Sequence, residues 1–128
     1  MRRIVTPLSI ENILEPTKSI HCTALVDTGA TFLTLPSEWK PKLGVLPNTR
    51  PVALEIATQA VVCGEVCGPV TLRIEGFDPV SSEVLFVEMQ PLDGVFEPLF
   101  GYIPLEQSQA AVDMWSHKLV KAKRMDLK

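Results

Sequence analysis

The chain has 128 residues, the length of a single domain, and its 46% apolar content is sufficient for a folded core. Its apolar runs are far too short to span a membrane. The net charge is −3, with residues 118–128 carrying +4 (five basic, one acidic) and the other 117 carrying −7 (seven basic, fourteen acidic). An acidic body argues against nucleic acid as the main partner, and we interpret 118–128 as a solvated basic tail, although such a tail can also contact an acidic surface.

Short apolar runs divided by proline, glycine and asparagine predict a mostly β chain. In the first half we expect strands over 4–13, 20–26 and 32–35, then a brief helix that begins at 36–39 and is ended by Pro41 and Gly44. Strands over 51–56 and 61–66 then predict a hairpin, whose polar tip is Ala57-Thr58-Gln59-Ala60.

The second half continues the β pattern. We expect strands over 70–74 and 84–87, joined across 76–79, and the second lacks clean alternation, which predicts burial on both faces. The sequence Leu99-Phe100-Gly101 follows, then a helix over 104–111 with proline in its opening turn. Closing strands are expected over 112–115 and 119–120. Together these elements predict an all-β domain with one short helix in its C-terminal half.

The three cysteines, Cys22, Cys63 and Cys67, are an odd number, and residues 1–7 do not resemble a signal peptide. We therefore expect reduced thiols and a cytoplasmic protein. His21 with the three thiols is a conceivable zinc set. However, Cys63 and Cys67 are separated by three residues within a predicted strand, so we predict no metal and no cofactor.

The strongest chemical motif is Asp27-Thr28-Gly29-Ala30, which follows the apolar run 24–26. Two carboxylates within about 3 Å of each other share one proton and can activate water as a general acid–base pair. The motif occurs once, so such a pair requires a homodimer. Glycine allows backbone N–H groups to approach the carboxylate, the hydroxyl can bond to a partner loop, and the small Ala30 leaves room for substrate. An ordinary β-turn is the alternative interpretation.

Residues 24–31, Ala-Leu-Val-Asp-Thr-Gly-Ala-Thr, resemble the active-site strand and loop of the retropepsins, the retroviral-type aspartic proteases, and most closely their small single-domain bacterial members. In that family a hairpin flap, an apolar-apolar-glycine element that supports the catalytic loop, and a helix come next. Residues 51–66, 99–101 and 104–111 follow in that order. The resemblance covers about residues 20 to 115.

The resemblance implies a closed, barrel-like, all-β fold that acts as a homodimer, with Asp27 of each subunit at the two-fold axis. Thr28 would interlock the two loops and Gly29 would supply backbone contacts. An extended peptide would lie between the floor of the site and the flaps. The residues expected to contact this peptide are Ala30, Ala57, Thr58, Gln59, Leu99 and Phe100.

The chain departs from the retroviral pattern at two positions that form an ion pair in those enzymes. Thr31 replaces a second aspartate, and Tyr102 replaces an arginine. The flap tip lacks the expected glycines, and the C-terminal tail is longer, so dimerisation through terminal strands would be arranged differently.

The leading hypothesis is therefore an aspartic endopeptidase with Asp27, Thr28 and Gly29 as its catalytic residues. Its expected partners are a second copy of the chain and a peptide or protein substrate, and we expect it to bind neither nucleic acid nor a membrane. Two alternatives stay open: an inert retropepsin-like dimer that binds peptides or promotes dimerisation, and an unrelated β-barrel adaptor. Trp39 and Trp115 are predicted to pack in or against the core. A cysteine nucleophile has no supporting motif.

Overall fold

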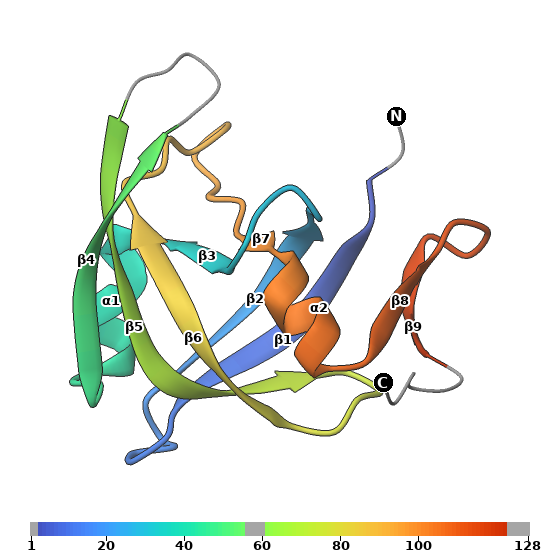
Figure 1. The fold of residues 1–128 in the computed structure, drawn as a ribbon, viewed down its shortest axis with the longest axis horizontal. Coiled ribbons are helices and arrows are strands. Elements are labelled where there is room, and N and C mark those ends of the chain that lie inside the picture. Colours follow the sequence, from blue (N-terminus) through green and yellow to red (C-terminus); the bar gives the residue numbers. More distant parts are fainter. Residues whose placement is uncertain (1–2, 56–60, 123–128) are drawn as a thin grey trace.

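The structure is a computed structural model that describes residues 3–55 and 61–122 (Figure 1). It consists of a strongly curved sheet, two short helical segments and a separate two-stranded hairpin. In chain order the elements are β1 (Val5–Asn12), β2 (Ser19–Val26), β3 (Leu33–Pro36), a 3-10 turn (Ser37–Trp39), α1 (Lys40–Leu43), β4 (Asn48–Glu55), β5 (Val61–Ile74), β6 (Val80–Val87), β7 (Leu99–Phe100), α2 (Tyr102–Gln107), β8 (Ala110–Asp113) and β9 (Lys118–Lys121).

The main sheet has seven strands in the order β1-β2-β7-β3-β6-β5-β4. Most pairs are antiparallel, but β2 with β7 and β3 with β6 are parallel. In β1 the side chains at alternate positions, from Thr6 to Asn12, are buried, as the period of a half-buried strand requires. The predicted two-sided burial is confirmed in β6, where Val84–Val87 are all buried.

The long strand β5 gives the sheet its curvature. Its first half pairs with β4 and its end pairs with β1, and the register against β6 shifts between Cys67 and Val70, where Gly68 and Pro69 interrupt the ladder. The expectation of a closed barrel is corrected here. The sheet curls back on itself through β1 and β5, but β4 pairs with β5 alone among the described strands and leaves a free edge.

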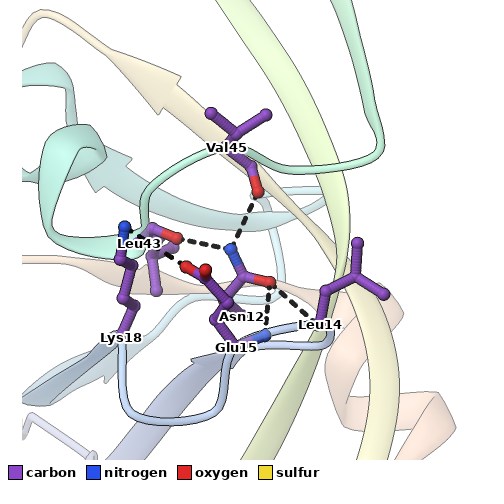
Figure 2. Close-up of polar contacts among 6 residues, drawn as sticks. All are labelled: Asn12, Leu14, Glu15, Lys18, Leu43 and Val45. Atoms are coloured by element: carbon purple, nitrogen blue, oxygen red, sulfur yellow. Dashed lines mark hydrogen bonds and ion pairs between the residues drawn. The ribbon is translucent and has the colours of Figure 1, made fainter.

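A buried asparagine fastens the lower end of the sheet to α1. Asn12 is 1% exposed, and its Nδ2 donates to the carbonyl oxygens of Leu43 at 2.6 Å and Val45 at 2.8 Å. Its Oδ1 accepts from the N–H groups of Leu14 at 2.8 Å and Glu15 at 3.1 Å. Figure 2 shows the amide between these two segments. One polar side chain thus satisfies four backbone groups around it.

The helical segments differ in extent from the prediction. Pro41 lies in the first turn of α1 and does not end it, because a proline in a first turn breaks no helical bond; Gly44, at φ 68°, does end it. The predicted helix over 104–111 is instead α2 at Tyr102–Gln107. Gln109 has a positive φ of 55°, which reverses the chain into β8. No helix in the described part of the chain is long and apolar enough to cross a membrane.

The C-terminal hairpin β8–β9 forms its own two-stranded sheet. Its first strand, Ala110–Asp113, begins and ends two residues earlier than the predicted strand over 112–115. Leu119 and Val120 lie in β9 as expected. Trp39 packs against the core, as predicted. Trp115 does not: it lies in the hairpin turn and is 96% exposed, because β8 ends two residues earlier.

Candidate active site

The backbone of β2 carries Asp27 to a fixed position between two neighbouring segments. On one side the Leu25 N–H donates to Pro98 at 2.8 Å, and the Asp27 N–H donates to Phe100 at 3.0 Å. On the other side the Val26 N–H donates to Ile4 at 2.8 Å. Asp27 is therefore positioned by a three-stranded arrangement rather than by a free loop.

The turn after β2 forms around the Asp27 carboxylate. The Gly29 N–H donates to Asp27 Oδ1 at 2.9 Å, and the Ala30 N–H donates to the Asp27 carbonyl oxygen at 3.0 Å. This is the local bonding typical of aspartate in a turn. Asp27 is half-buried, whereas Thr28 is exposed, and its hydroxyl makes no hydrogen bond within residues 3–55 and 61–122.

Gly101 supports this turn from below by close packing. A Cβ at Gly101 would lie 2.6 Å from the Phe32 carbonyl oxygen and 2.7 Å from both the Ala30 carbonyl oxygen and the Thr31 carbonyl carbon. Only glycine permits this approach. Immediately after it, the Tyr102 N–H donates to Ala30 at 2.9 Å and the Ile103 N–H to Thr31 at 3.0 Å. The first N–H groups of α2, which lack partners within the helix, thus bind carbonyl oxygens of the loop after β2.

A second apolar cluster, separate from the main core, begins at the end of the same loop. Its buried members come from β5 and β6, and the half-buried ones include Phe32 from the loop and two residues of β4. The members are Val66, Leu85, Val87, Phe32, Val52, Leu54 and Met89. This cluster was not predicted from the sequence. The lack of clean alternation at 84–87 was the sequence feature that could have predicted the cluster, because a strand buried on both faces needs an apolar partner on each face.

The segment between β6 and β7 is also anchored near the loop. Leu92 and Val95 exchange two backbone bonds of 2.9 Å across a tight turn and are both largely exposed. Phe96 packs edge-on against Trp39, with ring centroids 6.2 Å apart, and Glu97 pairs with Arg3. These contacts tie the segment before β7 to both the N-terminus and the 3-10 turn.

The predicted site residues fall into three groups. Asp27, Thr28, Gly29 and Ala30 lie together in the turn. Leu99 is half-buried, but Phe100 is fully buried in the main core and has no exposed surface with which to contact a peptide. Ala57, Thr58 and Gln59 lie outside the described residues.

A groove of about 590 Å³ lies elsewhere, over β1, β2 and the end of β5. It contains His21, which bonds through Nδ1 to the Ser9 hydroxyl at 2.7 Å, and Cys22. Burial raises the pKa of the Cys22 thiol to about 11, so this thiol is protonated and unreactive near neutral pH. Within residues 3–55 and 61–122, no three histidine, cysteine or acidic side chains gather as metal ligands.

Comparison with known proteins shows similarity at the level of structure. No protein-family model matches the chain, and no curated protein is significantly similar to it in sequence. A solved structure of EIAV protease with the inhibitor HBY-793 aligns with a TM-score of 0.62 at 17% identity, covering 88% of this chain and 94% of that one. The retroviral protease-like domain of Ddi1 from Leishmania major aligns with a TM-score of 0.59 at 14% identity, covering 97% and 91%. The fold is therefore retropepsin-like.

Proposed function

We propose that this chain is an aspartic endopeptidase that works as a homodimer, with one Asp27 per subunit in a shared catalytic pair. The observation that carries the proposal is the placement of Asp27. It is a single half-buried carboxylate at the end of β2, in a turn that is fixed by α2 and by the close approach of Gly101. A retropepsin-like fold built around this turn supports the same reaction.

The chemistry follows from two Asp27 carboxyl groups that share one proton. The ionised carboxylate removes a proton from a bound water, and the water oxygen bonds to the peptide carbonyl carbon. The protonated partner gives its proton to the carbonyl oxygen, which produces a neutral tetrahedral diol. Collapse of the diol breaks the C–N bond, and the leaving nitrogen takes a proton from the carboxyl group that removed it from water. The other Asp27, now ionised, takes a proton from one hydroxyl of the diol, which becomes the carbonyl of the acid product, so the pair again shares one proton. No covalent bond to the enzyme forms.

Each residue of the turn has a role in this proposal. The exposed Thr28 hydroxyl interlocks with the partner's loop, the Gly29 N–H holds one Asp27 oxygen at 2.9 Å, and Ala30 leaves space for an extended peptide. Leu99 and the tip residues Ala57, Thr58 and Gln59 are the further proposed peptide contacts. The apolar cluster around Phe32 supports a site that accepts apolar side chains.

The partners in this account are a second copy and a peptide or protein substrate. We place the reaction in the cytoplasm because the three cysteines are free thiols. The resemblance of residues 24–31 to the active-site strand and loop of the small single-domain bacterial members is the basis on which we propose that group for this chain.

The test is cleavage of a mixed peptide library, from acidic to neutral pH, by the wild-type protein and by Asp27→Asn. We expect cleavage by the wild-type protein and at least a thousandfold loss in the variant, which keeps the shape of the turn but cannot ionise. Equal cleavage by both would remove Asp27 from the mechanism. No cleavage by a wild-type dimer would favour the inert peptide-binding alternative, and a protein that stays monomeric would favour the adaptor.

A further inference from the structure

Two short segments flank the end of the strand that carries Asp27. Strand β2 lies between β1 and β7 in the sheet (Figure 1). The Val26 N–H donates at 2.8 Å to the carbonyl oxygen of Ile4, one residue before β1 begins. The Leu25 N–H donates at 2.8 Å to the carbonyl oxygen of Pro98, one residue before β7 begins. Both acceptors therefore lie at strand ends, where backbone hydrogen bonds open most readily.

Strand pairing holds neither segment firmly. The pairing of β1 with β2 ends at Val5 and Leu25, so Ile4 lies beyond the last pair and is fixed in part by burial of its side chain. Strand β7 has only two residues, and it pairs with β2 at two positions and with β3 at one. The positions of the Ile4 and Pro98 carbonyl oxygens therefore depend on contacts other than the strand pairing.

An ion pair joins the two segments across β2. Arg3, the residue before Ile4, pairs with Glu97, the residue before Pro98, and their side chains are 58% and 33% exposed. The ion pair and the two backbone hydrogen bonds complete a circuit that runs from Arg3 through Ile4 to β2, and from β2 through Pro98 to Glu97. Movement of either segment away from β2 therefore has to break the ion pair or drag the other segment with it.

A second arginine–glutamate pair at β1 differs from this one in what it joins. Arg73 Nε donates to Glu11 at 3.1 Å, and the arginine side chain is 54% exposed. These residues lie on β5 and β1, which pair directly with each other. That ion pair adds to a contact that the backbone already makes, whereas Arg3 and Glu97 connect the starts of β1 and β7, which β2 separates.

We propose that Arg3 and Glu97 are positioning residues, whose ion pair holds the carbonyl oxygens of Ile4 and Pro98 against β2 and so fixes Asp27 at the end of that strand. The inference rests on the proposed function, in which the placement of Asp27 sets the rate of the reaction. A partly exposed ion pair contributes little to global stability. Its effect is therefore on the local order of the end of β2 and on kcat, with KM and folding left nearly unchanged.

The experiment measures kcat and KM of the full chain for Arg3→Met, Glu97→Gln and the double variant, at protein concentrations where each sediments as a dimer. The matched control is Arg73→Met, which removes an arginine of nearly the same exposure from a pair that does not span β2. We expect each single variant to lower kcat roughly fivefold, the ratio that a partly exposed ion pair sustains, and Arg73→Met to keep the wild-type kcat. The double variant should lose no more than either single variant, because the two side chains act only as a pair. Exchange of the charges, Arg3→Glu with Glu97→Arg, should restore most of the lost kcat.

A second readout needs no catalysis. Hydrogen exchange of the Leu25 and Val26 amides, followed by NMR, should be roughly fivefold faster in Arg3→Met and in Glu97→Gln, while amides of β6 keep their wild-type rates. If wild type cleaves no peptide but these two amides respond, the proposed function fails and the positioning role of the pair stands. Unchanged exchange and unchanged kcat in both single variants would overturn the positioning role and leave the peptidase standing. Losses of kcat that multiply in the double variant would show that the two side chains act separately, and would also overturn it.

Discussion

Replacing Gly101 with alanine tests whether the loop that carries Asp27 is held by close backbone packing. Gly101 has φ −83° and ψ −175°, an extended conformation that alanine adopts freely, so the substitution adds a methyl group without backbone strain. That methyl would lie 2.6 Å from the Phe32 carbonyl oxygen, and an ordinary contact is at least 3.4 Å. The loop or β7 must therefore move by about 0.8 Å, the difference between these two distances.

The expected cost has two parts. Overpacking of this kind lowers the free energy of unfolding by about 1–3 kcal/mol. The displaced atoms belong to the loop that carries Asp27, and a misplacement of about 1 Å in a catalytic group lowers kcat by roughly a hundredfold. Chemical denaturation followed by fluorescence measures the first effect, and peptide cleavage at saturating substrate measures the second.

Asn12→Ala is the matched control for this experiment. It removes the amide that bonds to Leu43 and Val45 and leaves buried backbone groups without partners, at a cost of about 2–3 kcal/mol. Asn12 lies at the far end of β1, roughly 23 Å along the strand from Val5, which pairs with Leu25 near Asp27. Asn12→Ala should lose as much free energy of unfolding as Gly101→Ala but keep the kcat of the wild-type protein. Equal kcat values in Gly101→Ala and wild type would refute the argument that Gly101 positions Asp27.

Three further predictions follow from single groups. Iodoacetamide at pH 8 should alkylate the exposed Cys63 well before Cys22, because burial raises the pKa of the Cys22 thiol to about 11. Mass spectrometry of the digested protein gives the order of alkylation, and the reverse order would show that Cys22 is not buried. The hydrogen bond to Glu65 at 2.8 Å raises the pKa of Lys40 above 10.5, so this pair stabilises the fold below that pH and its contribution is lost as pH rises through the folded-state pKa. Because the pair is partly exposed, Lys40→Met should lower the free energy of unfolding by only about 0.5 kcal/mol at pH 8. Above pH 10.5 the free energy of unfolding of this variant should fall less steeply with pH than that of wild type, and parallel curves would contradict this. The Ser116 hydroxyl and the Trp115 N–H lower the pKa of Asp113, so the NMR shift of the Trp115 amide should titrate with a midpoint below 3.8, and a midpoint at or above it would mean that these hydrogen bonds to Asp113 do not form.

Much of the fold follows from local pattern. Short apolar runs divided by turn residues predicted β1 and β2 to within two residues, and proline and glycine marked both helical segments. The turn at Asp27 was recognisable because aspartate, threonine and glycine each have a local reason to be there.

What the sequence did not predict depends on contacts between distant segments. That β5 is one bent strand serving β4, β6 and β1 is a matter of tertiary pairing, and proline at position 69 argued for a break there. An apolar side chain at Phe100 suits both a peptide contact and core packing, and only the structure shows that it is fully buried in the core. Trp115 was expected to pack because tryptophan usually does, but β8 ends before it and the Asp113 turn directs it to solvent.

The most direct test of the central claim is a subunit-mixing experiment, in which a fixed amount of wild-type protein is equilibrated with increasing Asp27→Asn protein before peptide cleavage is measured. If each active site needs one Asp27 from each of two chains, random pairing leaves about half of the original activity at a one-to-one ratio and about a tenth at a ninefold excess of the variant. Activity that stays constant at every ratio would show that a single chain catalyses alone, and would contradict the shared pair on which the account depends.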